Sequence, residues 1–314
     1  MRFIFFGSSK FAEIILNKLL KANMKPVLVV TAPPKVKGRK KVLSPTPVHN
    51  LAEQNKISIL TPENLKDEEF LSNFKNYNLD LVILAAYGKI IPLQLLSIPK
   101  KGILNLHPSL LPRWRGATPI QSAILAGDKK TGVSLFLMDE GVDHGPIIQK
   151  TEYKIQNLSI TYSELSQKLA EIGADLIINI APKWLKGEID SIPQDHSSVS
   201  YCHKILPEDE KIDWNKSNIE IDRKIRALNP NPGVFTKTTK EDGIIIKIVK
   251  GYPVNDLTIY KNKAPGQVFE FKNKLAVKCG VGIYVIEELR PAGKNTMSSE
   301  SFLRGNQWIL KTNF

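Results

Sequence analysis

Three polar side chains within residues 102–149 have types and a spacing that suit acyl-transfer chemistry: Asn105, His107 and Asp143. An asparagine can donate a hydrogen bond to a developing oxyanion without titrating. A histidine can move a proton near neutral pH, and an aspartate can orient an imidazole and stabilise its charge. No Ser, Cys or Lys is obviously activated by these three residues. The trio therefore favours direct attack of a substrate nucleophile on a carbonyl over a covalent enzyme intermediate.

The same residues also allow a purely structural interpretation. His107 stands directly before Pro108, and Asp143 lies in a turn between Gly141 and Gly145. Short motifs of this kind carry a real risk of false positives. On composition alone, a structural histidine and a turn aspartate explain the pattern as well as a catalytic pair does.

The elements that must position the trio have the pattern of an open α/β sheet. Residues 81–86 and 132–138 are apolar runs, and these two buried strands are predicted to deliver the trio to one edge of a sheet, where such folds bind ligands. The chain begins with a predicted strand, a turn at Gly7, a helix and a second strand, over residues 2–6, 11–20 and 25–30. One glycine in that turn is not a dinucleotide fingerprint, so no NAD site is predicted.

The local sequence around the trio resembles a known family. Asn105 and His107 stand in N-x-H-x-S-L-L-P, which is followed by R-W-R-G at 113–116, and Asp143 stands in D-E-G-x-D-x-G at 139–145. These motifs resemble those of the 10-formyltetrahydrofolate-dependent formyltransferases, and they are most similar to the branch that acts on methionyl-tRNA. The resemblance implies that Asn105, His107 and Asp143 are the catalytic residues.

The resemblance also implies a site for 10-formyltetrahydrofolate beside the trio. It assigns to this site the S-L-L-P residues and the residues that follow the predicted strand 81–86, namely Ser109, Leu110, Leu111, Pro112, Gly88, Lys89 and Ile90. Pro108 is a departure, since many relatives have a small residue at this position. It stiffens the backbone after His107 and leaves the three polar positions unchanged.

Residues 31–48 are too polar and too rich in proline for a regular element, and they are predicted to form a loop that leaves the sheet. Five cations occupy seven positions of this loop: Lys35, Lys37, Arg39, Lys40 and Lys41. Such a cluster suits contact with phosphates, although most charge runs are only a solvated surface. The methionyl-tRNA branch carries a similar basic insertion that ends in x-x-P-x-P-V. This implies that the loop binds tRNA, with Arg39 against the acceptor end.

The net charge of +13 is concentrated at the two ends of the chain. Residues 1–50 hold ten Lys or Arg against one acidic residue, and residues 205–314 hold eighteen against thirteen. Residues 51–204, which carry the trio, hold sixteen against seventeen. A polyanionic partner that touches both ends would explain this distribution, and so would a general richness in lysine.

The composition predicts two domains and a linker. A capping box at Thr161 and Glu164 begins a long helix, after which residues 187–207 lack periodicity and are predicted to link a formyltransferase domain at 1–186 to a second domain at 208–314. The second domain offers a helix and five short strands, over residues 219–228, 233–236, 244–249, 266–271, 275–278 and 282–289. This pattern is typical of a small β-barrel. The predicted fold is therefore a doubly wound, Rossmann-like α/β domain followed by an OB-like tRNA-binding barrel.

The resemblance, together with the basic regions, implies an enzyme that moves the formyl group of 10-formyltetrahydrofolate to the α-amine of initiator methionyl-tRNA, for translation initiation. We expect a cytoplasmic protein, because the apolar runs are far shorter than a membrane span and the N-terminus lacks a secretory pattern. We also expect a monomer. No metal site is expected, because Cys202 and Cys279 lack metal-ligand spacing and hydrogen bonds can polarise a formyl carbonyl.

Two alternatives remain. A formyltransferase for a small amine, such as glycinamide ribonucleotide or an amino-sugar nucleotide, would keep the trio but would not need the basic loop or a basic barrel. A non-catalytic tRNA-binding protein built on a decayed formyltransferase would keep the basic regions, and the intact Asn105, His107 and Asp143 argue against it.

Overall fold

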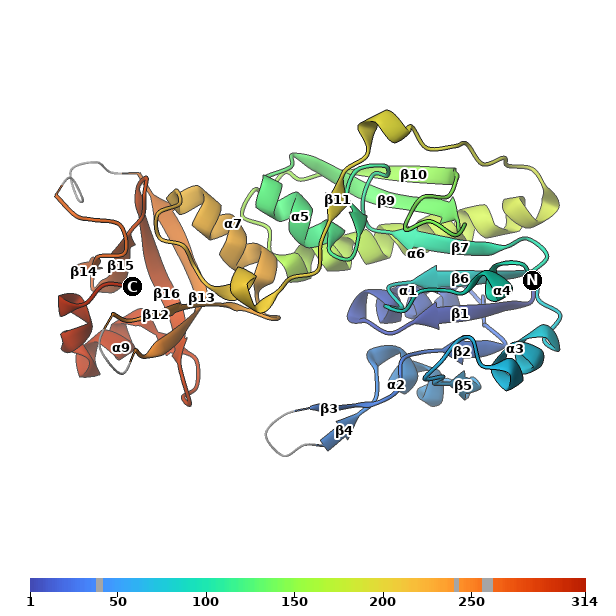
Figure 1. The fold of residues 1–314 in the computed structure, drawn as a ribbon, viewed down its shortest axis with the longest axis horizontal. Coiled ribbons are helices and arrows are strands. Elements are labelled where there is room, and N and C mark those ends of the chain that lie inside the picture. Colours follow the sequence, from blue (N-terminus) through green and yellow to red (C-terminus); the bar gives the residue numbers. More distant parts are fainter. Residues whose placement is uncertain (38–41, 240–242, 256–261) are drawn as a thin grey trace. The chain divides into compact units, whose positions relative to one another are not determined.

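The structure, a computed structural model, describes residues 1–37, 42–239, 243–255 and 262–314 (Figure 1). The chain divides into two compact units. The first comprises residues 1–119, 129–156 and 165–203, and the second comprises residues 120–128, 157–164 and 204–314. Residues 187–203, which belong to the predicted linker, therefore lie in the first unit.

A seven-stranded sheet forms the centre of the first unit, with the strand order β10-β9-β7-β6-β1-β2-β5. Its strands are β1 (Phe3–Gly7), β2 (Leu28–Val30), β5 (Ile59–Leu60), β6 (Leu81–Ala85), β7 (Ile103–His107), β9 (Lys130–Leu137) and β10 (Ile147–Lys154). The five strands from β7 to β5 are parallel, β9 pairs antiparallel with β7, and β10 pairs antiparallel with β9. The strand order reverses between β1 and β6, which is the position where doubly wound folds bind ligands. The predicted fold class of this unit is confirmed.

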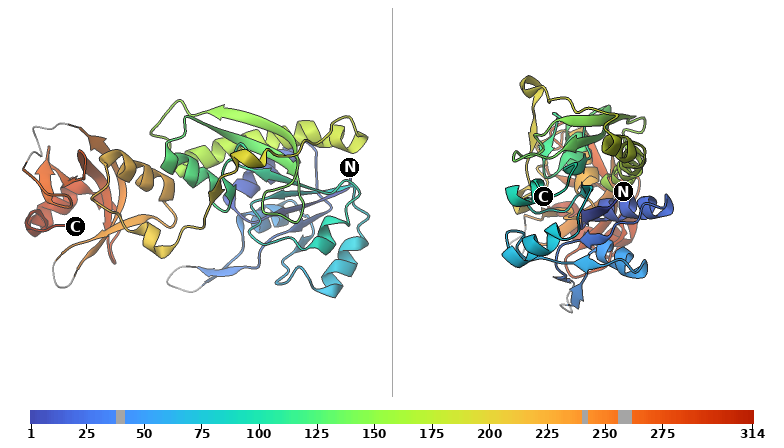
Figure 2. Two further views of the ribbon diagram at one scale, coloured as in Figure 1. Left: turned by 45° about the horizontal axis from the view of Figure 1, so that its top comes forward. Right: turned by 90° about the vertical axis from the view of Figure 1, so that its right-hand side faces the viewer.

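Helices cover both faces of this sheet (Figures 1 and 2). They are α1 (Lys10–Lys21), α2 (Pro47–Gln54), α3 (Glu68–Lys75), α4 (Leu93–Leu96) and α6 (Tyr162–Lys186). On one face, Phe6 and Val82 belong to an apolar cluster with Phe74 of α3 and Leu95 of α4. On the other face, Gly173 of α6 lies close to side chains of α1, β7 and β9. Because both faces are covered, β1, β6 and β7 are buried throughout, and β1 and β6 are apolar runs in the sequence.

The basic segment contains a hairpin that the sequence did not predict. Strands β3 (Lys35–Lys37) and β4 (Val42–Ser44) pair antiparallel, with Val36 opposite Leu43, so the prediction of a loop without regular elements was wrong here. Apolar and β-branched residues alternate with the lysines and favour strands, although Val36, Val42 and Leu43 remain exposed. The hairpin projects from the body of the unit (Figures 1 and 2). Arg39, Lys40 and Lys41 lie outside the described residues.

The second unit is built on an antiparallel sheet with the strand order β12-β13-β16-β15-β14, and β17 pairs with β16. Its elements are β12 (Val234–Lys237), β13 (Ile245–Val254), β14 (Val268–Phe271), β15 (Lys274–Lys278), β16 (Ile283–Pro291), β17 (Met297–Ser298), α5 (Pro119–Ala126), α7 (Asn218–Leu228), α9 (Ser299–Gly305), and the 3-10 turns η2 (Pro207–Glu210) and η3 (Gln307–Lys311). Register shifts interrupt the pairing of β13 with β16, and such bulges bend a sheet. The five predicted strands are all present. In the described parts of the chain, no helix is both long and apolar enough to cross a membrane.

Helix α7 begins with a capping box formed by Ser217 and Glu220. Because Glu220 titrates, the stability that this cap gives to the helix depends on pH. Ser217 Oγ accepts a hydrogen bond from Glu220 N (3.2 Å), and Glu220 Oε2 accepts from Ser217 Oγ (2.7 Å) and Ser217 N (2.9 Å). These bonds to Ser217 hold the pKa of Glu220 below its usual value. A carboxylate with a lowered folded-state pKa stabilises the fold above its unfolded-state pKa, and it loses that contribution as the pH falls through the folded-state pKa.

We therefore expect Ser217→Ala to lower the free energy of unfolding by about 1 kcal/mol at pH 7. Urea titrations of wild type and variant at pH 7 and pH 3 measure this difference. The difference in free energy of unfolding should become smaller at pH 3, because a protonated Glu220 accepts weaker hydrogen bonds from Ser217 than the carboxylate does. An equal difference at both pH values would show that the Glu220 carboxylate does not contribute to the cap.

Candidate active site

Strand β7 presents two of the three predicted catalytic residues. Asn105 and His107 are two residues apart on this strand, so their side chains point to the same face. Both residues are almost fully buried, with 7% and 5% of their surface exposed. The sequence prediction placed the trio between two strands and missed this third one, which lies between β6 and β9. Its polar residues interrupt the apolar pattern because they face the site.

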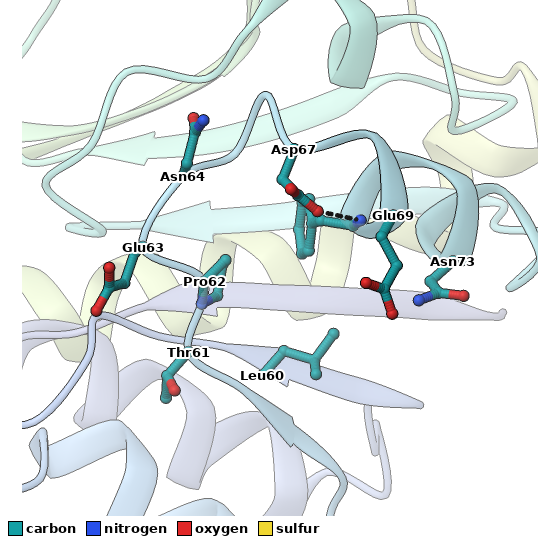
Figure 3. A pocket seen from close by; sticks show the side chains of 9 residues that line it. Leu60, Thr61, Pro62, Glu63, Asn64, Asp67, Glu69 and Asn73 are labelled. Carbon is teal, nitrogen blue, oxygen red and sulfur yellow. Dashed lines mark hydrogen bonds between the residues drawn. The ribbon is translucent and has the colours of Figure 1, made fainter.

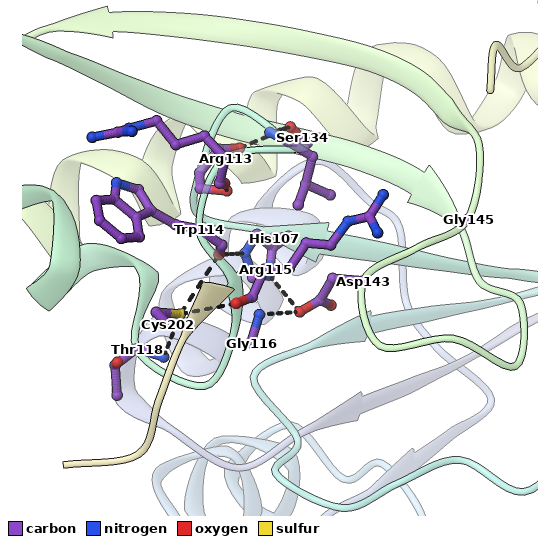
Figure 4. Close-up of polar contacts among 12 residues, drawn as sticks. His107, Arg113, Trp114, Arg115, Gly116, Thr118, Ser134, Asp143, Gly145 and Cys202 are labelled. Atoms are coloured by element: carbon purple, nitrogen blue, oxygen red, sulfur yellow. Dashed lines mark hydrogen bonds and ion pairs between the residues drawn. The ribbon is translucent and has the colours of Figure 1, made fainter. Parts of the chain in front are cut away.

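Asp143 reaches the same place from the turn between β9 and β10. The turn closes where Leu137 N donates to Pro146 O (3.0 Å), and Gly145 packs so closely that a Cβ there would lie 1.9 Å from Leu137 O. Asp143 itself has a left-handed backbone, with φ at +46°. Its Oδ2 lies 3.5 Å from His107 Nδ1 and accepts a hydrogen bond from Gly116 N at 2.8 Å (Figure 4). The structure thus brings His107 and Asp143 together.

Both nitrogens of the His107 imidazole face acceptors of the protein. Nδ1 faces the Asp143 carboxylate, and Nε2 lies 2.9 Å from Trp114 O. A carbonyl can only accept, so Nε2 carries a proton in this contact. Donation from Nε2 to a substrate oxygen therefore requires that this N–H be shared with Trp114 O or turned away from it. By contrast, the Asn105 amide makes no side-chain hydrogen bond within the described part of the chain, and it is available to a ligand.

The S-L-L-P residues are held against β9 and β10. The Ser109 hydroxyl donates to Arg113 O (2.6 Å), and Ser134 Oγ donates to Ser109 O (2.7 Å) and accepts from Leu111 N (3.0 Å). Lys150 Nζ donates to Leu111 O (2.7 Å). The Ser109 hydroxyl and the Leu111 carbonyl are therefore already hydrogen-bonded within the protein. A ligand of this loop would contact its surface and its other backbone groups more readily than the Ser109 side chain.

The other predicted folate residues follow β6. Gly88 has φ at +86°, Lys89 Nζ donates to Pro62 O and Glu63 O (both 2.7 Å), and Ile90 is 90% exposed. The preceding Tyr87 is buried, which raises its pKa to about 12 and keeps its phenol neutral at physiological pH. Gly88 and Lys89 lie at the carboxyl end of β6, the strand next to β7.

A cavity of about 510 Å³ lies where β1, β2 and β6 end. Its walls come from the residues after these strands and after β5, and from the base of the β3–β4 hairpin: Ser8, Ala32, Pro33, Lys35, Ser44, Pro45, Thr46, Pro47, Glu63, Tyr87, Gly88 and Lys89. Ser8 is anchored to both sides, since its hydroxyl donates to Tyr87 O and accepts from Ala32 N. The trio does not line this cavity, but β6 adjoins both β1 and β7, so the two features share one edge of the sheet.

A second cavity, of about 430 Å³, lies between the end of β5 and α3 (Figure 3). Its polar walls include Glu63, Asp67 and Glu69. Asp67 caps α3, because its Oδ1 accepts from Phe70 N at 2.9 Å. This acidic lining repels polyanions, so the cavity does not suit a nucleic-acid phosphate.

Several residues that hold the trio in place could not be identified from the sequence. Gly116 belongs to β8 (Arg115–Gly116), which pairs with β11 (Tyr201–Cys202), and two-residue strands show no periodicity. Gln194 lies in the predicted linker, and its side chain contacts the Asp143 turn. Ser134 could have been found from the sequence, since it is the one hydroxyl residue in the apolar run 132–138.

The fold and the site define a formyl transferase. Residues 1–180 match the family model described as formyl transferase, and residues 204–307 match the model of the formyl transferase C-terminal domain. Among curated relatives, methionyl-tRNA formyltransferase of Rickettsia bellii is 38% identical over 97% of both chains. That of Gluconobacter oxydans is 39% identical over 97% of both chains. This chain belongs to the methionyl-tRNA formyltransferase family, as the motifs predicted.

Solved structures share the fold at lower identity. The N-formyltransferase from Helicobacter canadensis, in complex with folinic acid and dTDP-3-aminofucose, has a TM-score of 0.65 at 21% identity, over 91% of this chain and 98% of that one. HypX from Aquifex aeolicus, in complex with tetrahydrofolic acid, has a TM-score of 0.65 at 16% identity, over 99% of this chain and 48% of that one. At these identities the likeness establishes the fold alone.

Proposed function

We propose that this protein transfers the formyl group of 10-formyltetrahydrofolate to the α-amine of initiator methionyl-tRNA. The observation that carries the proposal is that His107 Nδ1 lies 3.5 Å from Asp143 Oδ2. The buried Asn105 amide points to the same face of β7 as His107 and makes no side-chain hydrogen bond among the described residues. Membership of the methionyl-tRNA formyltransferase family supports it over the small-amine and non-catalytic alternatives.

In the proposed reaction, the neutral amine attacks the formyl carbon. A C–N bond forms, and negative charge develops on the formyl oxygen. The Asn105 amide and the shared Nε2–H of His107 donate to that oxygen, and each such donor is worth about 3–4 kcal/mol in the transition state. The Asp143 carboxylate stabilises the imidazolium, and the trio helps to pass the amine proton to N10 of the folate. The bond from the formyl carbon to N10 then breaks, which releases tetrahydrofolate and N-formylmethionyl-tRNA.

We place the folate between two backbone segments at the carboxyl edge of the sheet. One is the S-L-L-P segment at 109–112, which its bonds to Ser134 and Lys150 hold rigidly. The other is 88–90, whose exposed Ile90 offers an apolar surface to an aromatic ring. The small-molecule sites of α/β proteins combine apolar walls with a few fixed polar groups, as these segments do.

We place the 3′ end of the tRNA in the cavity at the ends of β1, β2 and β6. Its volume of about 510 Å³ lies within the usual range for small-ligand sites, about 300–1,000 Å³. Lys35 and Lys89 contribute positive charge against the one carboxylate in the wall, that of Glu63, and Lys89 also donates to two carbonyls. The wall continues into the β3–β4 hairpin, so the basic residues 35–41, Arg39 included, are proposed to contact the phosphates of the acceptor stem.

A comparison of acceptors tests the proposed substrate. Enzyme in excess is mixed with labelled 10-formyltetrahydrofolate and with initiator methionyl-tRNA, elongator methionyl-tRNA, glycinamide ribonucleotide or an amino-sugar nucleotide. Rapid transfer to initiator methionyl-tRNA, and slow transfer to the others, is expected. Transfer only to a small amine would support the catalytic role of the trio and would contradict the proposal that the basic hairpin binds tRNA.

The basic hairpin is expected to account for part of the salt dependence of tRNA binding. Each phosphate contact contributes roughly 0.7–0.9 to the slope of log K against log salt concentration. Replacing Lys35, Lys37, Lys40 and Lys41 with alanine should therefore reduce that slope by about 3. Filter binding between 50 and 200 mM salt measures this. The control replaces Lys183 and Lys186, which are exposed at the end of α6, and an equal loss of slope per lysine replaced would assign the effect to net charge.

A further inference from the structure

The segment around Gln194 is fastened to the first unit on both sides. Ile192 and Ile147 exchange two backbone hydrogen bonds of 2.8 Å, and η1 (His196–Ser198) leads to β11, which pairs with β8. Gln194 lies between these attachments and is 6% exposed. Its side chain is therefore delivered to a fixed point beside the Asp143 turn.

The Gln194 amide makes four hydrogen bonds there. Nε2 donates to Asp143 O (2.9 Å) and Gly145 O (2.8 Å), and Oε1 accepts from Arg115 Nε (3.1 Å) and Nη2 (2.7 Å). A guanidinium can only donate and a carbonyl can only accept, so these partners determine which end of the amide is oxygen. The glutamine thus satisfies its full capacity by joining β8 to the turn that carries Asp143.

These contacts close a ring around Asp143. Gly116 N holds its carboxylate, Gln194 holds its backbone carbonyl, and Arg115, the residue before Gly116, holds Gln194. Asp143 has a left-handed backbone, and such a conformation costs on the order of 1 kcal/mol or more for a non-glycine residue. The bonds from Gln194 to the turn offset this cost. Without them, the turn is free to relax and to carry the carboxylate away from His107.

Arg115 strengthens the contact through its charge. Its side chain is almost fully buried, and its partners in the described residues are the Gln194 oxygen and His196 Nδ1, at 3.5 Å. A cation that donates to an amide oxygen polarises the amide and strengthens hydrogen bonds from its N–H groups. Since those N–H groups hold the Asp143 turn, Arg115 acts on Asp143 through Gln194.

We infer that Gln194, supported by Arg115, is a positioning residue for formyl transfer: it holds the Asp143 turn so that the carboxylate faces His107. The inference rests on the proposed function of the trio. Gln194 touches neither His107 nor the reacting atoms; it acts by fixing the backbone of a residue that does.

The variant Gln194→Glu separates positioning from folding. A glutamate keeps the size of the side chain and can pair with Arg115, but it presents an oxygen to Asp143 O and Gly145 O, where the glutamine presents two donors. We expect the single-turnover rate at saturating substrates to fall by about 100-fold, the effect of a misplacement of roughly 1 Å. The KM values for tRNA and folate should change by less than threefold. The control is Gln156→Glu, an exposed loop residue that adds the same charge.

A crystal structure of Gln194→Glu gives a readout besides activity, since the hydrogen bond of 2.8 Å between Gly116 N and Asp143 Oδ2 should be lost.

If this variant does not fold, the double variant Arg115→Met, Gln194→Met replaces both of these polar side chains together, a change that folds more easily. The same loss of rate is expected. An unchanged rate in the variant that folds, or a raised KM at an unchanged rate, overturns the inference. If the wild type formylates no methionyl-tRNA, the proposed function fails, and the position of Asp143 in the crystal still decides whether Gln194 holds the turn.

Discussion

Replacing His107 with alanine is expected to lower the single-turnover rate of formyl transfer to methionyl-tRNA by about 10³-fold, within the range for a general acid or base. The substitution removes the Nε2–H that is proposed to face the formyl oxygen, and it removes the imidazole ring that faces Asp143. Rapid-quench transfer assays measure the rate, and filter binding measures the affinity for tRNA, which should be unchanged.

The two readouts together exclude a non-catalytic tRNA-binding protein. That alternative requires that the wild type lack transfer activity, so that His107→Ala has no effect on it. A rate within tenfold of wild type would show that the imidazole takes no direct part in the chemistry. A large loss of tRNA affinity would assign His107 to binding.

Replacing Asp143 with asparagine is expected to have a similarly large effect, between about 10³-fold and the roughly 10⁴-fold found for an aspartate that orients a catalytic imidazole. An amide oxygen can still accept the hydrogen bond from Gly116 N, and asparagine tolerates the left-handed backbone at this position. The variant should therefore fold, and its lower rate of transfer would measure the contribution of the negative charge opposite His107. Thermal unfolding and single-turnover transfer measure the two properties.

The same turn offers a matched control for this substitution. Asp139 pairs with His144 at 2.6 Å and accepts from Gly141 N, and within the described residues no hydrogen bond or ion pair joins its side chain to the trio. Asp139→Asn removes one negative charge from the turn and should keep the rate within about threefold, as for most surface changes. Equal losses in Asp139→Asn and Asp143→Asn would mean that the net charge of the turn matters, and not the charge opposite His107.

The buried parallel strands were the easiest elements to predict. The run at 81–86 is apolar throughout because helices cover both faces of the sheet, and it became β6 almost unchanged. β7 was missed because Asn105 and His107 replace apolar residues on the face that forms the site. The β3–β4 hairpin was missed because prolines and lysines dominate its composition, whereas its stability depends on local pairing across the hairpin.

Residue type and a family resemblance were sufficient to single out Asn105, His107 and Asp143, but not the contacts that position them. Arg115 and Gln194 are 79 residues apart and meet only because β11 pairs with β8. The contact of His107 Nε2 with Trp114 O could not be predicted from the sequence either, since it depends on how residues 113–116 fold back over the end of β7. Such tertiary contacts leave no periodic signal in a sequence.

The central claim is direct transfer of the formyl group between the two substrates at the trio. It is tested by mixing excess wild-type enzyme with 10-formyltetrahydrofolate labelled in the formyl group and with initiator methionyl-tRNA, and then measuring the label in the folate, protein and tRNA fractions over time. We predict that label lost from the folate appears on the methionine amine at the same rate, with none bound to the protein. Label that accumulates on the protein before it reaches the tRNA, for example on the nearby Cys202, would contradict direct attack, and label that never reaches the tRNA would contradict the function itself.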